Sequence, residues 1–175
     1  MVDRLWQFPK VFSETPGLTS WVEHDIDVGD SKPIKLPPYR LNPQRQAALD
    51  KELKYMIDHG LIKRAYSEWC SPVTLQPKPD GKVRLCVDFR KINALSTTDS
   101  YPLPRVDDSV DQVGNARYIT KIDLMKGYWQ VPLTPRAKKI ASFVVSGAVY
   151  QCQVMPYGLK NAPATFQRLM NRVVD

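Results

Sequence analysis

One long segment after residue 40 has the apolar spacing of a helix. It begins with Asn42 and Pro43, which are typical of a helix N-cap and first turn, and it ends at Gly60, a residue type common just past a helix C-terminus. The apolar side chains of its expected buried face recur at helical spacing: Leu49, Leu53, Met56 and Ile57. We therefore predict a helix over 42–60 that packs this face against a core.

Alternating apolar and polar residues predict a β-hairpin after this helix. Strands over 71–76 and 82–89 flank Pro79-Asp80-Gly81, a sequence typical of a tight turn. In the second strand the odd-numbered positions are apolar and the even-numbered positions carry charge or a thiol, so one face is expected in the core and the other exposed. Lys82, Arg84 and Arg90 are expected to project together from the polar face.

Shorter patterns predict the remaining elements. A helix over 104–113, ended by Gly114, is followed by a strand over 118–124 and a helical turn from Thr134-Pro135. A hairpin of strands 140–145 and 148–154, turning at Ser146-Gly147, and a helix over 161–174 complete the chain. Phe166, Met170 and Val173 are expected on one face of the last helix. These elements predict an α+β fold of antiparallel hairpins packed with helices.

The first 40 residues differ from the rest of the chain. They hold five prolines and no sustained apolar period, which predicts an extended arm that wraps the body or links it to another part; a disordered linker is the alternative.

The net charge of the chain also changes sign after its first part. Residues 1–30 carry 2 Lys/Arg and 6 Asp/Glu, a net charge of −4. Because the formal net charge of the whole chain is +7, residues 31–175 carry +11. A basic body favours a polyanionic partner such as nucleic acid, although many basic domains bind none.

Several classes of site are disfavoured. Three widely spaced cysteines (Cys70, Cys86 and Cys152) support neither a disulfide framework nor a zinc site, and two histidines argue against histidine-based metal sites and a Ser-His-Asp triad. The start of the chain has no signal-like apolar region, and no apolar run approaches the roughly 20 residues of a membrane span. We therefore expect an intracellular protein of the cytoplasm, a particle or the nucleus, with no membrane partner.

Phosphate binding would have to come from side-chain cations, because the sequence has neither of the two standard glycine-rich phosphate loops. Lys78, Lys82 and Arg84 surround the tip and polar face of the first predicted hairpin, where a polyphosphate or a nucleic-acid backbone would fit. An ordinary solvated charged face is the alternative.

Acidic residues offer one candidate for chemistry. Asp123 falls at the end of the predicted strand 118–124, and a buried carboxylate there would need a cation: either a metal ion or Lys121 in a simple ion pair. The adjacent pair Asp107-Asp108 lies in a predicted first helical turn, where carboxylates interact favourably with the helix dipole, so we interpret that pair as structural.

Five motifs follow one another in a fixed order: Ser71-Pro72-Val73; Lys78 to Arg90 (KPDGKVRLCVDFR); Tyr101-Pro102-Leu103-Pro104; Lys121 to Gln130 (KIDLMKGYWQ); and Val154 to Gln167 (VMPYGLKNAPATFQ). In this order they resemble the fingers and early palm of reverse transcriptases from gypsy-type long-terminal-repeat retrotransposons. The resemblance covers residues 24–174. It implies a right-hand RNA-directed DNA polymerase fold, with fingers and a partial palm over 41–175 behind an arm over 1–40.

The resemblance also implies metal and nucleotide sites. Asp123 would be the catalytic, metal-binding carboxylate, and the carbonyl of Leu124 would join one of two Mg²⁺ ions. Lys78 and Arg84 would grip the triphosphate of an incoming deoxynucleotide, since developing phosphoryl charge needs fixed cations. Beside them, Leu124 and Tyr157 would flank the nucleotide, and Tyr128 would exclude a ribose 2′-OH.

The same resemblance implies contacts with an RNA or DNA template-primer. Lys82, Arg90 and Gly158 would make them. One departure from the family is Pro79, which stands where relatives usually carry a second lysine, so the grip on phosphate would rest on Lys78, Lys82 and Arg84.

A larger departure is that the Tyr-x-Asp-Asp hairpin, which supplies the remaining metal carboxylates in the family, is not in the sequence. A two-metal site cannot be held by one aspartate. We therefore expect a fragment of a retrotransposon polyprotein that is inactive by itself, although its parent is an enzyme. The alternative is a retained non-catalytic module that binds nucleic acid or a partner; the oligomeric state stays open.

Overall fold

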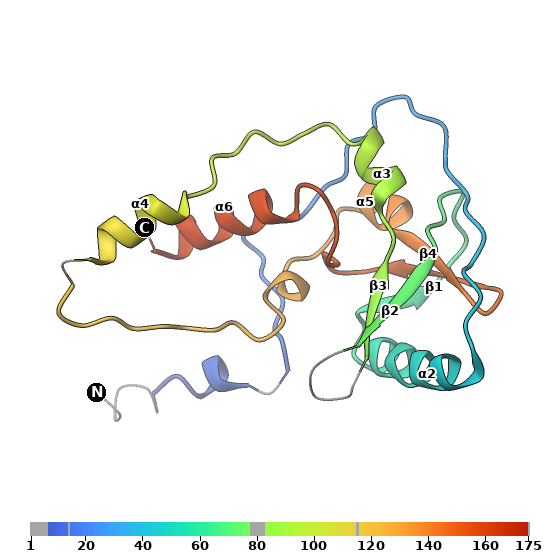
Figure 1. Cartoon of the computed structure of the whole chain (residues 1–175), viewed down its shortest axis with the longest axis horizontal. Coiled ribbons are helices and arrows are strands. Elements are labelled where there is room, and N and C mark those ends of the chain that lie inside the picture. The colour runs from blue at the N-terminus through green and yellow to red at the C-terminus, as the bar shows by residue number, and fades with distance from the viewer. Residues whose placement is uncertain (1–6, 14, 78–82, 115, 175) are drawn as a thin grey trace.

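The computed structural model of the chain describes residues 7–13, 15–77, 83–114 and 116–174 (Figure 1). Its helices are η1 (Pro9–Phe12) and η2 (Gly127–Gln130), both 3₁₀, and the α-helices α2 (Pro43–Asp58), α3 (Arg90–Leu95), α4 (Val106–Val113), α5 (Pro135–Ile140) and α6 (Ala162–Val174). Its strands are β1 (Ile62–Arg64), β2 (Val73–Pro77), β3 (Val83–Val87), β4 (Ser142–Val145) and β5 (Ala148–Cys152). The predicted α+β class with antiparallel hairpins is confirmed.

Two small antiparallel sheets form the centre of the molecule. One has the strand order β1-β5-β4, and the other is the β2-β3 hairpin. They join through Ser71, whose N–H donates to the carbonyl of Ser142 (3.0 Å) and whose carbonyl accepts from the N–H of Val144 (3.0 Å). The turn of the β4-β5 hairpin falls at Ser146 and Gly147 as predicted, with positive φ at both residues (49° and 77°), which a two-residue hairpin turn requires.

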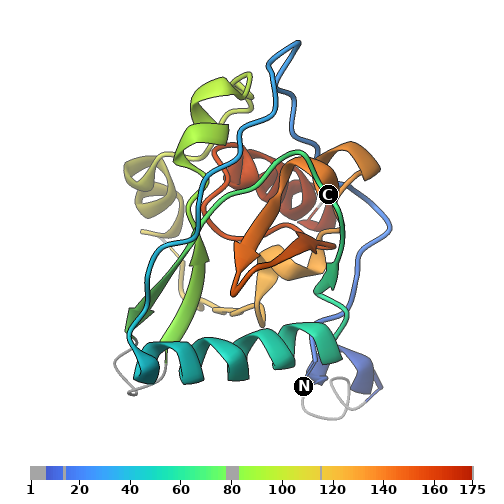
Figure 2. The same ribbon diagram turned by 90° about the vertical axis from the view of Figure 1, so that its right-hand side faces the viewer.

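Helix α2 runs across the base of the molecule beneath the strands (Figure 2). Its predicted N-cap is confirmed, since the side chain of Asn42 accepts from the backbone N–H of Arg45 (2.8 Å). Its buried residues are Leu49, Leu53 and Met56. The prediction was wrong for Ile57, which is 43% exposed, because successive residues of a helix point about 100° apart and Met56 already faces the core.

The first predicted hairpin is confirmed as β2-β3, but its second strand ends earlier than expected. Phe89 has φ −87° and ψ 8°, which is not extended, and Arg90 is the first residue of α3. Asp88 causes this bend in part, since its carboxylate accepts from the N–H of Arg90 (3.2 Å). Arg90 therefore does not share a strand face with Arg84, as we had expected. The predicted turn at 79–81 lies outside the described residues.

The predicted strand over 118–124 was wrong. The segment is an extended connection between α4 and η2 (Figure 1), and its apolar side chains are exposed: Tyr118 by 85%, Ile119 by 68% and Ile122 by 79%. A strand needs a neighbour to pair its backbone groups, and no described strand lies beside this segment. The alternation of apolar and polar residues alone was therefore not enough to form a strand here.

The remaining helices follow their local signals. Asp107 and Asp108 lie in the first turn of α4, as predicted, and the Thr134 side chain caps α5 by accepting from the N–H of Ala137 (3.1 Å). On α6, Phe166, Met170 and Val173 share one face of the helix as predicted, and Val173 in the last turn is 57% exposed. Among the described residues, none of the helices combines the length and apolar character that crossing a membrane requires.

The arm wraps the body over residues 22–36, so the disordered-linker alternative is wrong there. His24, Ile26 and Val28 are buried in the core. The backbone N–H of His24 donates to the carbonyl of Pro132 (2.9 Å), and its carbonyl accepts from the N–H of Thr134 (3.0 Å). The division between arm and body at residue 40 stays a prediction. Hydrogen bonds such as those of His24 join the two parts.

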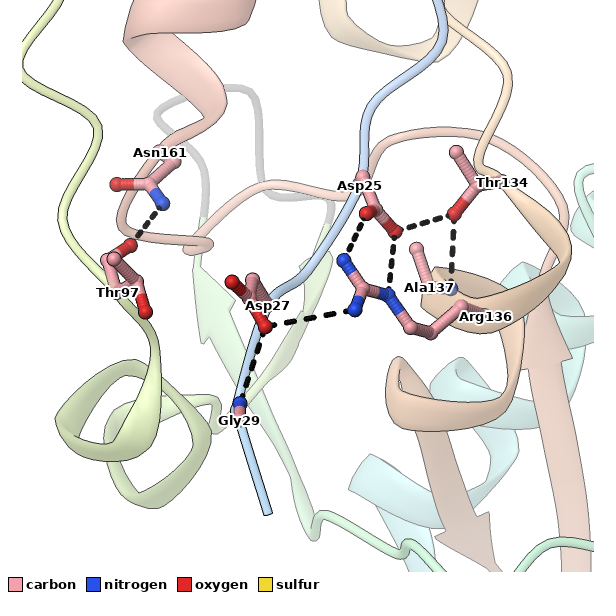
Figure 3. A network of polar contacts seen from close by, with 8 residues as sticks. All are labelled: Asp25, Asp27, Gly29, Thr97, Thr134, Arg136, Ala137 and Asn161. Carbon is pink, nitrogen blue, oxygen red and sulfur yellow. Dashed lines mark hydrogen bonds and ion pairs between the residues drawn. The ribbon is translucent and has the colours of Figure 1, made fainter. Parts of the chain in front are cut away.

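A polar network fixes the arm to the start of α5 (Figure 3). The guanidinium of Arg136 lies between the carboxylates of Asp25 and Asp27, pairing with Asp25 and reaching Asp27 at 3.5 Å. The hydroxyl of Thr134 also donates to Asp25 (2.6 Å). These contacts, the Arg136 hydrogen bond above all, lower the pKa of Asp25. Arm and helix therefore share one charge network.

His24 joins the arm to α6. It is 1% exposed, and its Nδ1 lies 2.8 Å from the hydroxyl of Thr165. Burial lowers the pKa of His24 from 6.5 to about 4, although Asp25 and Asp99 oppose that shift. The imidazole is therefore neutral near pH 7 and serves as a core hydrogen-bonding group.

Acidification is expected to weaken the fold through His24. Because the folded pKa of about 4 lies below the unfolded value of 6.5, the unfolded chain binds a proton first as the pH falls. The stability is fully present above pH 6.5 and is lost progressively down to about pH 4, with a maximum near 3 kcal/mol. Urea unfolding over this pH range measures it. His24→Gln should remove that slope, and identical pH profiles for the two proteins would contradict the assignment.

Candidate functional site

Four aromatic side chains gather where η2, the loop before α6 and α6 meet. This aromatic cluster consists of Tyr128, Trp129, Tyr157 and Phe166. The ring centroids of Tyr128 and Tyr157 are 5.3 Å apart and stacked, and those of Tyr128 and Phe166 are 5.2 Å apart, edge to face. Trp129 is 6.4 Å from Tyr157. Tyr128 therefore lies at the centre of the cluster, in geometries that favour aromatic pairs.

The backbone around Gly127 makes the cluster possible. A Cβ atom built on Gly127 would lie 2.8 Å from Cζ of Phe166, a distance that real Cβ atoms do not reach. Lys126 precedes it with a left-handed φ of 47°, and its ammonium lies over the rings of Tyr55 (4.1 Å) and Trp129 (4.2 Å). A strained turn and a residue without a side chain thus let η2 approach α6.

Arg84 lies at the open edge of the cluster. Its guanidinium carbon is 5.7 Å from the ring centroid of Tyr157, which is 38% exposed. Burial raises the pKa of Tyr128 and of Tyr157, and Arg84 opposes the shift at Tyr157. Both phenols are therefore neutral near pH 7. The fold brings together Arg84, Tyr128 and Tyr157, three residues for which the family resemblance implies one nucleotide site.

A depression of about 330 Å³ reaches Gly158, the residue after Tyr157; its lining residues are Thr74, Gln76, Val87, Asp88, Phe89, Arg90, Asn93 and Gly158. Arg90 and Gly158, two of the predicted template contacts, therefore share one hollow. Gly158 has a φ of 95°, and its carbonyl accepts from the side-chain amide of Asn93 (2.8 Å). This conformation favours glycine at position 158.

Asp88 holds Arg90 in place. The guanidinium donates to both carboxylate oxygens (2.9 and 2.7 Å), and the hydroxyl of Tyr39 donates to one of them (2.9 Å). The Arg90 hydrogen bond holds the pKa of Asp88 well below its usual range. Asp88 therefore pairs with Arg90, whereas Arg84 faces Tyr157 instead. Sequence reasoning missed Tyr39, since it comes from the arm and carries no local signal.

Asp123 lies apart from this polar group. Its side chain is exposed, and it forms no ion pair with Lys121, so the alternative of a simple Lys121–Asp123 pair is wrong. The next residue, Leu124, lies near the turn that carries the cluster: its Cβ is 3.6 Å from the Cβ position built on Gly127. In the described part of the chain, no three His, Cys, Asp or Glu side chains form a group that could hold a metal ion. Lys78 and Lys82 lie outside the described residues.

The three cysteines are free thiols, as predicted from their spacing. Burial raises the pKa of each, and that of Cys152 reaches about 12. A thiol in this state is a poor nucleophile and a poor metal ligand. The cysteines therefore do not contribute to the site.

Comparison with protein families and sequences gives matches along the chain. Residues 76–175 match the family described as "Reverse transcriptase (RNA-dependent DNA polymerase)". The retrovirus-related Pol polyprotein from transposon 297 of Drosophila melanogaster is 33% identical over 89% of this chain and 15% of that protein. The enzymatic polyprotein of Cauliflower mosaic virus (strain Strasbourg) is 31% identical over 93% of this chain and 25% of that protein. The chain thus spans a quarter or less of these relatives.

Solved structures share the fold. The prototype foamy virus protease-reverse transcriptase (CSH mutant) matches with a TM-score of 0.83 and 23% identity, covering 99% of this chain and 25% of that chain. The foamy viral protease-reverse transcriptase in complex with an RNA/DNA hybrid matches with a TM-score of 0.81 and 20% identity, covering 98% of this chain and 24% of that chain. At this identity the likeness concerns the fold.

Substituting Gly127 is expected to disrupt the aromatic cluster. Gly127→Ala places a methyl group against Phe166, so the ring must move, which should lower the free energy of unfolding by about 1–3 kcal/mol. Urea unfolding and near-ultraviolet circular dichroism measure the two effects. Gly17→Ala is the matched control, since a Cβ there would meet nothing within 4 Å. Equal stabilities for the two variants would show that the close approach at Gly127 does not matter.

Proposed function

The chain belongs to the reverse transcriptase family, and from this membership we propose that it forms the fingers and part of the palm of an RNA-directed DNA polymerase, encoded within a retrotransposon polyprotein. One observation carries the proposal: Arg84, Tyr128 and Tyr157 come from three separate segments and meet at one place. A hollow lined by Arg90 and Gly158 includes the residue that directly follows Tyr157. A cationic and aromatic surface of this kind suits a nucleotide beside a nucleic-acid strand.

In this proposal Arg84 binds the triphosphate of the incoming deoxynucleotide together with Lys78. The guanidinium of Arg84 is exposed beside Tyr157, so its hydrogen-bond donors are open to phosphate. Tyr157 flanks the sugar. Tyr128 lies behind it, wedged between Tyr157 and Phe166, and a ring held on both sides cannot move aside for a ribose 2′-OH. Steric exclusion needs such a fixed ring.

A divalent metal ion, proposed to be Mg²⁺, would supply positive charge to the reacting phosphates. Mg²⁺ in nucleotide sites is held by one or two carboxylates with substrate phosphates and water, so the exposed carboxylate of Asp123 fits as one ligand. The carbonyl of Leu124 would be a second. The described residues supply only this partial set, in which Asp123 is proposed as the catalytic carboxylate that would hold the ion.

The template-primer is proposed to lie over the hollow beside Tyr157. Arg90, held by Asp88, would bind a backbone phosphate, and Lys82 would bind another. Gly158 has no side chain, so a nucleic-acid strand could approach its backbone closely. The foamy viral relative has been solved with an RNA/DNA hybrid and shares this fold, which supports such a partner.

We also propose the division of the chain. Residues 41–175 would be the fingers and partial palm, and residues 1–40 an arm that is part of the same folded unit. The hydrogen bond between His24 and Thr165 supports that unity, since it joins the arm to the last helix.

Removing the two arginines should weaken nucleic-acid binding in a salt-dependent manner. Each bound cation displaces counterions from the phosphates, so Arg84→Ala with Arg90→Ala should flatten the dependence of log affinity on log salt by about two phosphate contacts. Fluorescence anisotropy with a primer-template duplex over a salt series measures this. The double variant Arg45→Ala/Lys51→Ala removes the same charge from exposed positions of α2 and serves as control. If both double variants behave alike, the binding face is elsewhere.

The ring of Tyr128 should decide sugar selection. In an active reverse transcriptase that carries this segment, Tyr128→Val should leave deoxynucleotide incorporation largely intact and raise ribonucleotide incorporation at least tenfold, equivalent to about 1.4 kcal/mol. Single-nucleotide insertion kinetics measure both rates. Tyr128→Phe keeps the ring and should keep the discrimination. Unchanged discrimination in the valine variant would make Tyr128 a structural aromatic residue only.

A further inference from the structure

A second surface lies between the arm, the loop after β1, α5 and β5. Two depressions meet there, of about 710 Å³ and 380 Å³, and Tyr66 and Val149 line both. Tyr66 is 103% exposed, as exposed as in an open chain. Its ring therefore stands as a ridge between two hollows. We call these two depressions and their shared ridge the Tyr66 surface.

Cationic side chains flank this ridge on both sides. Lys35 and Lys139 line the larger depression, Arg64 lines the smaller one, and all three are exposed. Arg136 also lines the larger depression, but it is neutralised between Asp25 and Asp27 (Figure 3). Besides these cations, the residues that line the larger depression include one carboxylate, that of Glu68. The surface is therefore basic on either side of an aromatic ring.

The loop that carries Tyr66 is anchored at both ends. On one side the N–H of Ala65 donates to the carbonyl of Val149 (3.1 Å), which ties the loop to β5. On the other side the hydroxyl of Ser67 donates to the carbonyl of Lys139 (2.8 Å) and accepts from the N–H of Trp69 (3.1 Å). The exposed ring thus stands on a fixed backbone, which reduces the ordering cost of binding to it.

We propose that the Tyr66 surface binds single-stranded nucleic acid, with a base stacked on the ring of Tyr66 and backbone phosphates at Lys35 and Lys139 on one side and at Arg64 on the other. An open aromatic face with cations on both sides matches the alternation of base and phosphate along a strand. A duplex does not fit, since its bases are stacked inside and cannot reach the ring. The surface shares no residue with the site proposed for the polymerase and binds whether or not that site acts as proposed.

Binding of a labelled oligo(dT) of about 12 nucleotides to the full chain tests the proposal. Tyr66→Ala should raise the Kd about tenfold, which corresponds to the loss of one stacked base, ~1.4 kcal/mol. Tyr66→Phe keeps the ring and should bind as the natural protein does. Tyr118→Ala is the control, because Tyr118 is also exposed (85%) with an arginine 5.7 Å from its ring. Equal Kd values for the two alanine variants would overturn the proposal.

Photocrosslinking gives a second readout that does not depend on affinity. An oligonucleotide with 5-iodouracil should crosslink to Tyr66, as located by mass spectrometry, and crosslinks confined to Tyr128 or Tyr157 would overturn the proposal. The Arg84→Ala/Arg90→Ala variant separates the two sites. It should weaken duplex binding and keep the tenfold effect of Tyr66→Ala on oligo(dT), so that the failure of one proposed site does not affect the test of the other. Competition by polyglutamate as strong as that by unlabelled oligo(dT) would show a general acidic-peptide surface and overturn the proposal.

Discussion

The close approach of η2 to α6 is the constraint on which the candidate site depends. Gly127 lies so near Phe166 that no side chain fits between them, and this proximity sets Tyr128 against both Phe166 and Tyr157. Tyr157 in turn lies under the guanidinium of Arg84. One backbone contact therefore determines where three predicted nucleotide-binding residues stand, because each ring is positioned by the one behind it.

The arm contributes to the same constraint through its contact with α6. His24 bonds to Thr165, which is one residue before Phe166, so a neutral, buried imidazole fixes the helix at the level of the aromatic cluster. Farther along α6, the guanidinium of Arg168 donates to both carboxylate oxygens of Asp99 (2.7 Å each). Helix α6 is thus held by residues far away in the sequence. The geometry of the cluster is a property of the whole described fold and not of one motif.

Local signals were predictable from the sequence, and long-range contacts were not. The cap at Asn42 and the turn at Ser146-Gly147 were correct because their chemistry involves neighbours only. The strand over 118–124 was wrong because a strand needs a partner that no local pattern reveals. At the site, the resemblance of motifs named Arg84, Tyr128 and Tyr157, but spacing alone could not place their side chains together, and the contribution of Tyr39 from the arm had no signal at all.

The two arginines of the site are held in physically different ways, and this difference bears on how each would meet a phosphate. Asp88 binds two nitrogens of the Arg90 guanidinium, so that side chain is fixed in direction although it is 84% exposed. Arg84 contacts an aromatic face, which restrains the plane of the guanidinium weakly and leaves its donors open. A regular backbone phosphate suits the fixed arginine, since its position recurs along a strand. A triphosphate that must enter and leave suits Arg84, because an adjustable cation can follow charge as it moves between oxygens.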